Sequence, residues 1–329
     1  MEKPWYKLWP DVYPKSLKYY EGSVVDFMEA SVRRFPERTA FIFMGKAMTY
    51  RELHDQSLRL ATALVDLGVK KGNRVALFMP NCPQFAVAYY AALKIGAILT
   101  MCSPLNSEAE LKYQINDSGA ETLITLKLNL LMDKLLKVKD QTGLKTIIVS
   151  GLDEALPAVK KYGFLLLKRK NIASIKSDSA AGIYIFKDLL AKYPPNPPQV
   201  KINGKEDVAV LAYTGGTTGL SKGAVITHYN TIVNVSQVIN WNAPTFGNRV
   251  IEDLTPENCN SQGSHVMAVT VVPWFHAMGT IAYLNYPIFV GTTTYVLPRF
   301  DPSEYLKVLK KYPIDAMGGA PPIYTSLLN

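Results

Sequence analysis

Between residues 49 and 149, segments of helical periodicity alternate with short runs of strand-forming residues, and this alternation constrains the fold most. After Thr49, the apolar residues Leu53, Leu60 and Leu64 recur at the spacing of one helix face. Strands that are separated by helices form parallel sheets with covered faces, so we expect an α/β fold with a mostly parallel sheet. The expected helices are 23–34 with Ser23 as its cap, 50–67 with a capping box from Thr49 to Glu52, 82–95 and 107–118. The expected strands are 74–79, 98–101, 122–125 and 146–149.

The composition supports a large buried core, because 48% of the 329 residues are hydrophobic. Two apolar stretches, 85–102 and 266–298, could be mistaken for membrane spans, which need about 20 apolar residues. Lys94 interrupts the first stretch, and Pro273 and Pro287 are among the residues that break the second. We therefore predict that both belong to the core, the second as buried strands around a helix.

The net charge of +9 favours acidic partners such as nucleotides, phosphates or an anionic membrane. Nucleic acid would also fit that charge, but no nucleic-acid-binding motif accompanies it, and we expect none to bind. The three cysteines, Cys82, Cys102 and Cys259, form no CxxC pair, which suits a reducing compartment. Residues 1–20 lack the apolar segment of a secretory signal, so we expect a cytoplasmic protein.

A proline-rich segment at 193–198 interrupts the alternating pattern, because prolines can continue neither a helix nor a central strand. We place a boundary after it. Residues 1–200 would form a first α/β subdomain with a basic insertion near 151–200, and residues 201–329 would form a second. Within the insertion, residues 156–170 mix apolar and basic side chains. They are either an element on a membrane surface or a solvated segment packed on the domain.

Residues 213–223 read Tyr-Thr-Gly-Gly-Thr-Thr-Gly-Leu-Ser-Lys-Gly between two strand-like runs. Small residues let backbone N–H groups surround a polyphosphate, and Lys222 adds a mobile positive charge. The segment is not a Walker A loop, because Lys222 stands between Ser221 and Gly223 and a strand follows; the spacing of a dinucleotide fingerprint is also absent. An ordinary flexible loop is the competing interpretation, but this combination of residues is far more specific, and we predict a phosphate loop.

This loop, followed by Thr227, His228 and Asn230, resembles the phosphate loop of the adenylate-forming superfamily and is most similar to that of long-chain fatty acid–CoA ligases. The resemblance implies the stacked α/β subdomains of the large N-terminal domain of those enzymes. It also implies ATP-dependent activation of a fatty acid to an acyl-adenylate and then to acyl-CoA, with release of pyrophosphate and AMP. Further segments that resemble the family are 78–85, 92–97, 104–106, 114–120, 272–276, 300–302 and 318–322.

The resemblance also implies that the protein uses ATP and Mg²⁺, with CoA as a substrate. It further implies roles for individual residues. His276 and Lys222 would be catalytic, and Thr214 would bind the magnesium ion. His276 would also border the acyl and adenylate pocket. Each site has a plain alternative: a strand-end hydroxyl for Thr214, a core histidine for His276, and a simple turn at 318–322. His228 is expected to be structural. The remaining phosphate-binding positions would be Gly215, Gly216, Thr217, Thr218, Gly219 and Ser221, and the remaining pocket positions Gly318, Gly319 and Ala320.

Later motifs of the family do not occur, neither the Tyr-Gly-x-Thr-Glu segment nor the C-terminal lid domain. We therefore expect the chain to be an incomplete portion, truncated at its C-terminal end and inactive alone. The implied partners are a fatty acid, ATP and CoA, while a peripheral membrane contact and a homodimer stay open. The rival functions are a ligase for aromatic or medium-chain acids, a phosphotransferase or P-loop ATPase, and a non-catalytic module that binds a nucleotide or an acyl group.

Overall fold

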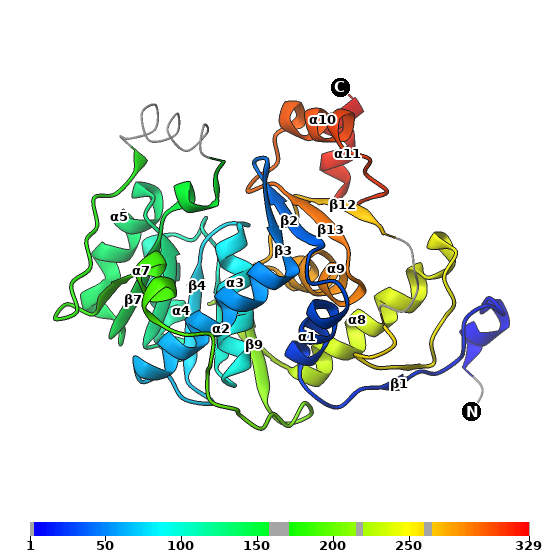
Figure 1. Ribbon diagram of the computed structural model, residues 1–329, viewed down its shortest axis with the longest axis horizontal. Helices are drawn as coiled ribbons and strands as arrows, with labels where there is room; N and C mark the ends of the chain where they lie inside the picture. Colours follow the sequence, from blue (N-terminus) through cyan, green and yellow to red (C-terminus); the bar gives the residue numbers. More distant parts are fainter. Residues whose placement is uncertain (1–2, 158–170, 215–219, 260–264, 329) are drawn as a thin grey trace.

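The computed structural model describes residues 3–157, 171–214, 220–259 and 265–328. Within these residues, two large sheets lie side by side with helices packed around them (Figure 1). The predicted α/β fold is confirmed, including the mostly parallel sheet. A small third sheet joins β1 (Lys18–Tyr19) to β11 (Asp253–Leu254).

The first sheet has the strand order β10-β9-β5-β4-β6-β7-β8. Its strands run parallel except for β10, which pairs antiparallel with β9. The strands are β4 (Arg74–Phe78), β5 (Ile98–Cys102), β6 (Thr122–Leu126), β7 (Thr146–Ser150), β8 (Ile183–Ile185), β9 (Val208–Tyr213) and β10 (Gly223–Thr227). The helices that connect them are α2 (Tyr50–Asp66), α3 (Pro83–Lys94), α4 (Glu108–Ser118), α5 (Asn129–Val138) and α7 (Phe186–Lys192).

The second sheet has the order β14-β12-β13-β2-β3, and only β3 runs antiparallel to its neighbour. Its strands are β2 (Thr39–Phe43), β3 (Lys46–Thr49), β12 (Met267–Thr270), β13 (Thr293–Val296) and β14 (Ala316–Met317). The helices of this half are α1 (Val24–Arg34), α8 (His228–Asn242), the π-helical η6 (Gly279–Asn285), α9 (Tyr286–Val290), α10 (Pro302–Lys311) and α11 (Pro321–Leu328). The stretch 266–298 thus forms strands around a helix, as predicted.

Both sheets take strands from either side of residue 200. Strands β9 and β10 follow that position but join the first sheet through β5. Strands β2 and β3 precede it but join the second sheet through β13. The proline-rich segment does lie between elements, as expected, but sheet membership does not change there.

Local capping explains where two early helices begin. The hydroxyl of Thr49 accepts from the Glu52 N–H (3.1 Å), and the Glu52 carboxylate accepts from the Thr49 N–H (2.7 Å). This is the predicted capping box at the start of α2. Ser23 caps α1 in the same way, as predicted. Helix α5 was not predicted from the sequence; its first residue follows Leu128, which offers no side-chain cap.

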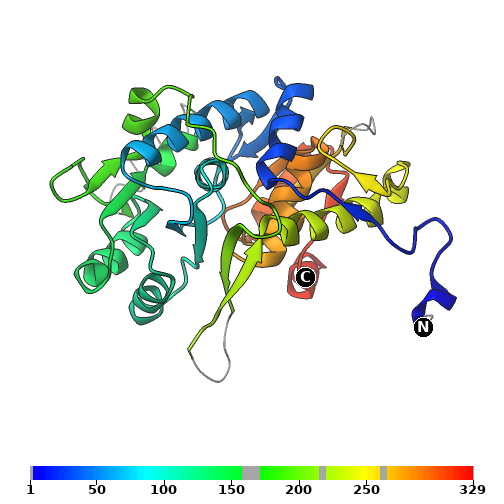
Figure 2. The same cartoon turned by 90° about the horizontal axis from the view of Figure 1, so that it is seen from below.

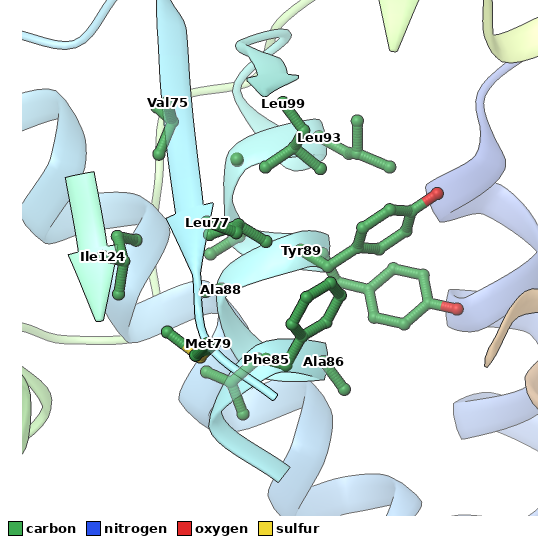
Figure 3. Close-up of a cluster of buried hydrophobic side chains, with 14 of the residues drawn as sticks. Val75, Leu77, Met79, Phe85, Ala86, Ala88, Tyr89, Leu93, Leu99 and Ile124 are labelled. Carbon is green, nitrogen blue, oxygen red and sulfur yellow. The ribbon is translucent and has the colours of Figure 1, made fainter. Parts of the chain in front are cut away.

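The core centres on α3, whose residues are all buried except Lys94. Figure 3 shows Phe85, Tyr89 and Leu93 of α3 against Leu77 of β4 and Leu99 of β5. The apolar stretch 85–102 is therefore core, as predicted. Over the residues that the structure describes, no helix combines the length and the apolar composition needed to cross a bilayer.

Candidate functional site

The base of the predicted phosphate loop is a closed hairpin. Gly223 pairs with Tyr213 at the ends of β10 and β9, and the Thr214 N–H donates to the Lys222 carbonyl (3.1 Å). The Ser221 hydroxyl then donates to the Thr214 carbonyl (2.6 Å). The side chains of Thr214 and Lys222 are exposed at this base. Residues 215–219 lie outside the described part of the chain, so five of the eight predicted phosphate-binding positions are not placed: Gly215, Gly216, Thr217, Thr218 and Gly219.

A tyrosine fastens this hairpin to the neighbouring helix. The Tyr213 hydroxyl donates to the Asp117 carboxylate on α4 (2.6 Å). Burial and the adjacent Asp117 carboxylate both raise the pKa of Tyr213, so the hydroxyl stays protonated and keeps donating. The sequence analysis assigned neither residue a role, although both lie in segments that carry the family resemblance.

Parallel pairing places the loop base at one edge of the first sheet. Ala212 of β9 is opposite Met101 of β5, so Thr214 leaves the sheet where β5 also ends. In parallel sheets the carboxyl ends of the strands share an edge, and ligands commonly bind outside it. The loop base therefore stands at the edge where a ligand site is expected.

The carboxyl ends of both sheets border an apolar groove of about 530 Å³. Asn81 and Leu105 follow strands β4 and β5, whereas Val272 and Phe300 follow strands β12 and β13 of the second sheet. Ala320, one of the predicted pocket residues, also lines this groove. Because strands of both sheets end here, the groove is a natural place for reactants to meet.

His276 lies beside this groove, in the turn after β12. Phe275, whose ring centroid is 4.7 Å from that of His276, lines the groove. The backbone N–H of His276 donates to the Pro273 carbonyl (3.1 Å), and the backbone carbonyl of His276 accepts from the Thr280 N–H (2.8 Å). The imidazole itself is exposed, yet partial desolvation lowers its pKa, which favours the neutral ring.

A buried asparagine, which the sequence analysis did not single out, holds this turn. The Asn81 side chain donates to the Val272 carbonyl (2.9 Å) and accepts from the Trp274 N–H (2.8 Å). Asn81 follows β4 of the first sheet, whereas Val272 and Trp274 belong to the second half. This amide therefore fixes the turn of His276 relative to the edge of the first sheet.

Gly318 lines a different cavity, of about 230 Å³, between α8 and the second sheet. A Cβ at Gly318 would stand 2.1 Å from the Tyr283 hydroxyl, so a side chain there would push Tyr283 aside. At Gly319, a Cβ would stand 2.4 Å from a methyl carbon of Ile323 on α11. The predicted pocket residues Gly318 and Ala320 thus face two separate cavities, which we call the Gly318 cavity and the apolar groove.

The Gly318 cavity adjoins a further cavity of about 480 Å³. Val238 and Asn242 of α8 line both. The further cavity is covered by the N-terminal residues Trp9 and Tyr13, and we call it the arm cavity. The two together extend from Gly318 along α8 toward the N-terminal segment.

The other histidines stand apart from this arrangement. His228 is buried at the start of α8, where Nδ1 accepts from the Val24 N–H (3.3 Å), as a structural histidine would. His265 contacts the Thr293 hydroxyl (3.0 Å). Within the described ranges, no group of three His, Cys, Asp or Glu side chains is arranged to hold a metal ion. Thr214 thus stays a predicted magnesium ligand.

Comparison with known proteins agrees with this geometry. Residues 28–329 match the AMP-binding enzyme family. The chain is 33% identical over 329 residues to a long-chain-fatty-acid–CoA ligase of Bacillus subtilis (strain 168), with 100% of this chain and 55% of that protein covered. It is also 33% identical over 341 residues to the ligase of the same name from Escherichia coli O6:H1, which is 56% covered.

Two solved structures share the fold. A long-chain-fatty-acid-CoA ligase from Archaeoglobus fulgidus superposes with a TM-score of 0.75 at 24% identity, covering 98% of this chain and 56% of that one. An anthranilate CoA ligase in complex with anthranoyl-AMP gives 0.73 at 20% identity, with coverage of 94% and 51%. The chain thus spans about half the length of these relatives. On the match over residues 28–329, the chain belongs to the AMP-binding enzyme family, as its phosphate loop predicted.

Proposed function

We propose that this chain is the ATP-binding part of an AMP-forming ligase that converts a long-chain fatty acid to its CoA thioester. The supporting observation is the closed loop base, with Thr214 and Lys222 exposed, at the edge where the strands of the first sheet end. The carboxylate of the acid would attack the α-phosphorus of ATP and displace pyrophosphate. The CoA thiol would then attack the acyl carbon and displace AMP.

In this proposal the loop from Thr214 to Lys222 binds the β- and γ-phosphates of ATP. Backbone N–H groups and the hydroxyls of the loop donate to phosphate oxygens, and Lys222 neutralises their charge. The Thr214 hydroxyl is a hard oxygen ligand of the kind that Mg²⁺ prefers, and the ion would offset the charge of the triphosphate. No protein nucleophile is needed, since both steps join groups that the substrates bring.

His276 would act where the carboxylate of the acid attacks the α-phosphorus of ATP. A neutral imidazole can donate one N–H to an oxygen that gains negative charge during the attack. The lowered pKa of His276 keeps that neutral form populated at pH 7. Asn81 and Thr280 hold the backbone on either side of the ring, so they serve as positioning residues.

The acyl chain would occupy the Gly318 cavity and continue into the arm cavity. Each buried methylene contributes roughly 0.8 kcal/mol, so additional apolar lining favours a longer acid. The Gly318 cavity alone, at about 230 Å³, would suit an aromatic or medium-chain acid, which is the second candidate substrate. The arm cavity, which adjoins it at Val238 and Asn242, favours the long chain.

We place the enzyme in the cytoplasm, with contact to the membrane surface. The three cysteine thiols are buried and unpaired, which suits a reducing compartment. Residues 158–170, the greater part of the predicted basic membrane element, lie outside the described residues, so that contact rests on sequence alone. A homodimer stays a prediction.

The test is fatty-acid-dependent exchange of labelled pyrophosphate into ATP, measured on this chain and on the longer ligase that we propose. We expect exchange by the longer protein and none by this chain. Lys222→Ala should slow exchange by about tenfold or more, whereas Lys310→Ala, an exposed lysine on α10, should leave it unchanged. The acid that supports the fastest exchange then reports the substrate class.

Two outcomes would count against the proposal. Release of ADP in place of AMP and pyrophosphate would indicate a phosphotransferase or ATPase. Absence of exchange by the longer protein, over short, long and aromatic acids, would leave a non-catalytic binding module.

A further inference from the structure

The N-terminal arm, residues 3–18, reaches away from the body of the molecule. Both views show it extending past α8 (Figures 1 and 2). Its inner side is anchored: Tyr13 stacks on Trp241 of α8, with centroids 4.8 Å apart, and its hydroxyl donates to the Trp241 carbonyl (3.0 Å). Where the arm joins the body, β1 pairs with β11. The arm is therefore held at two places while its tip projects.

The arm carries exposed apolar side chains. Leu8 is 90% exposed, Trp5 57% and Val12 56%. Trp5, Tyr6 and Trp9 pack edge to face in a row, with centroids 6.2–6.3 Å apart, which holds these side chains in place. Large apolar side chains that cluster on a projecting tip mark a binding surface rather than random exposure.

Lysines surround this apolar tip. Lys3 lies over the Trp5 and Tyr6 rings, at 5.6 and 5.9 Å, and Lys15 lies over Tyr6 at 5.1 Å. Lys7 and Lys18 are exposed nearby in sequence. Among the described arm residues, Asp11 is the single acidic side chain. Tryptophan, leucine and lysine together suit the boundary between lipid headgroups and acyl chains, where the aromatic rings insert and the lysines reach phosphate.

We propose that the N-terminal arm docks on the surface of an anionic lipid bilayer. Its positive charge complements an anionic headgroup layer, whereas the same arm of a second copy would be repelled. Its helix, η1 (Pro4–Leu8), is too short to span the bilayer, so the arm lies on the surface. Docking does not depend on the proposed ligase activity.

The benefit of this docking for substrate uptake does rest on the proposed function. Trp9 and Tyr13 of the arm, with Leu17, cover the arm cavity, which adjoins the Gly318 cavity. A long-chain fatty acid is held in the bilayer, so docking would bring the mouth of its cavity to the place where the substrate is stored.

Co-sedimentation with vesicles tests the proposal without ATP or acid. Binding should be strong to phosphatidylglycerol vesicles, weak to phosphatidylcholine vesicles, and reduced by salt. Lys7→Glu with Leu8→Ser should lower the binding constant by about tenfold or more. A matched change on α10, Lys310→Glu with Leu306→Ser, removes the same charge and a 39% exposed leucine and should have little effect.

A second measurement reports depth. Brominated lipids should quench tryptophan emission, and Trp5→Phe should lower that quenching, because Trp5 is 57% exposed on the arm; Trp241→Phe, which removes a 59% exposed tryptophan of α8, should lower it less. Equal vesicle binding by the arm and α10 variants would overturn the proposal. The proposal would also be overturned if the protein did not bind vesicles but formed concentration-dependent dimers that Leu8→Ser abolishes. The arm would then bind a second copy of the chain. Loss of pyrophosphate exchange with intact vesicle binding would count against the proposed function alone.

Discussion

At the scale of single residues, His228 shows how a polar group in a family-like motif is used for structure. It is fully buried, and the negative charge of Asp207 acts on the ring. Burial lowers the pKa of His228 to about 4, although Asp207 acts to raise it. The neutral ring, which accepts from the Val24 N–H, ties α8 to α1.

This burial predicts a pH dependence of stability. The unfolded chain protonates His228 near pH 6.5 and the folded chain only near pH 4, so the unfolded state binds more protons between these values. The free energy of unfolding should therefore fall by about 3 kcal/mol as the pH drops from 7 to 4. Urea unfolding at several pH values measures it.

The matched variants are His228→Asn, which should lose this dependence, and His265→Asn, which should keep it. Glu29 titrates lower: burial would raise its pKa, but the neighbouring His54 and a hydrogen bond from Lys94 hold it at about 2. Stability that Glu29 contributes is thus lost below the His228 window. An unchanged pH profile in His228→Asn would contradict the prediction.

At the scale of elements, the hairpin of β9 and β10, which carries the predicted phosphate loop, is held by a helix that lies far away in sequence. Tyr213 at the end of β9 and Asp117 near the end of α4 are 96 residues apart, yet their side chains share a 2.6 Å hydrogen bond. At its base, the loop is closed by the short-range contacts of Thr214 with Lys222 and Ser221. Helix α4 therefore sets the direction in which the hairpin leaves the sheet.

Removing that hydroxyl should weaken nucleotide binding. Tyr213→Phe loses one charge-assisted hydrogen bond, so the Kd for Mg-ATP should rise by about fivefold to thirtyfold. Tyr113→Phe is the matched control, because its hydroxyl is 3.4 Å from the same carboxylate and exposed. Titration calorimetry on the two variants decides, and equal affinities would show that the contact with Asp117 does not position the loop.

At the scale of the whole molecule, a second buried amide, besides that of Asn81, joins the two halves. Asn285 at the end of η6 accepts from the Tyr90 hydroxyl (3.0 Å) and donates to the Tyr89 hydroxyl (2.9 Å), both on α3. Burial raises the pKa of both tyrosines, so the hydroxyls stay neutral. Polar groups in a core must find partners, and here the partners come from opposite halves.

This network predicts a large effect on stability. Asn285→Ala leaves two buried hydroxyls without their partner and should cost about 3 kcal/mol in denaturant unfolding. Replacing the whole network, with Asn285→Leu, Tyr89→Phe and Tyr90→Phe, should cost less than that single change, because neither tyrosine hydroxyl is then left unpaired. A larger loss in the triple variant would show that volume, rather than hydrogen bonding, dominates.

The sequence by itself determined the local elements and the family. Helices with a regular apolar period and a capping residue were predicted to within a residue or two, as at Thr49 and Ser23. Helix α5 was not, and it lacks a side-chain cap, although α3, which also lacks one, was predicted. The phosphate loop could be predicted because the chemistry proposed for it depends on consecutive residues, which a linear sequence displays directly.

Only the tertiary structure decided which sheet each strand joins and which distant residues meet. Strand pairing of β9 with β5, or of β13 with β2, depends on contacts between segments over 100 residues apart, and local periodicity carries no information about them. The same holds for Asn81 at the turn of His276, for the two cavities beside α8, and for the anchored arm. Each arises where separate elements pack together, so no single stretch of sequence encodes it.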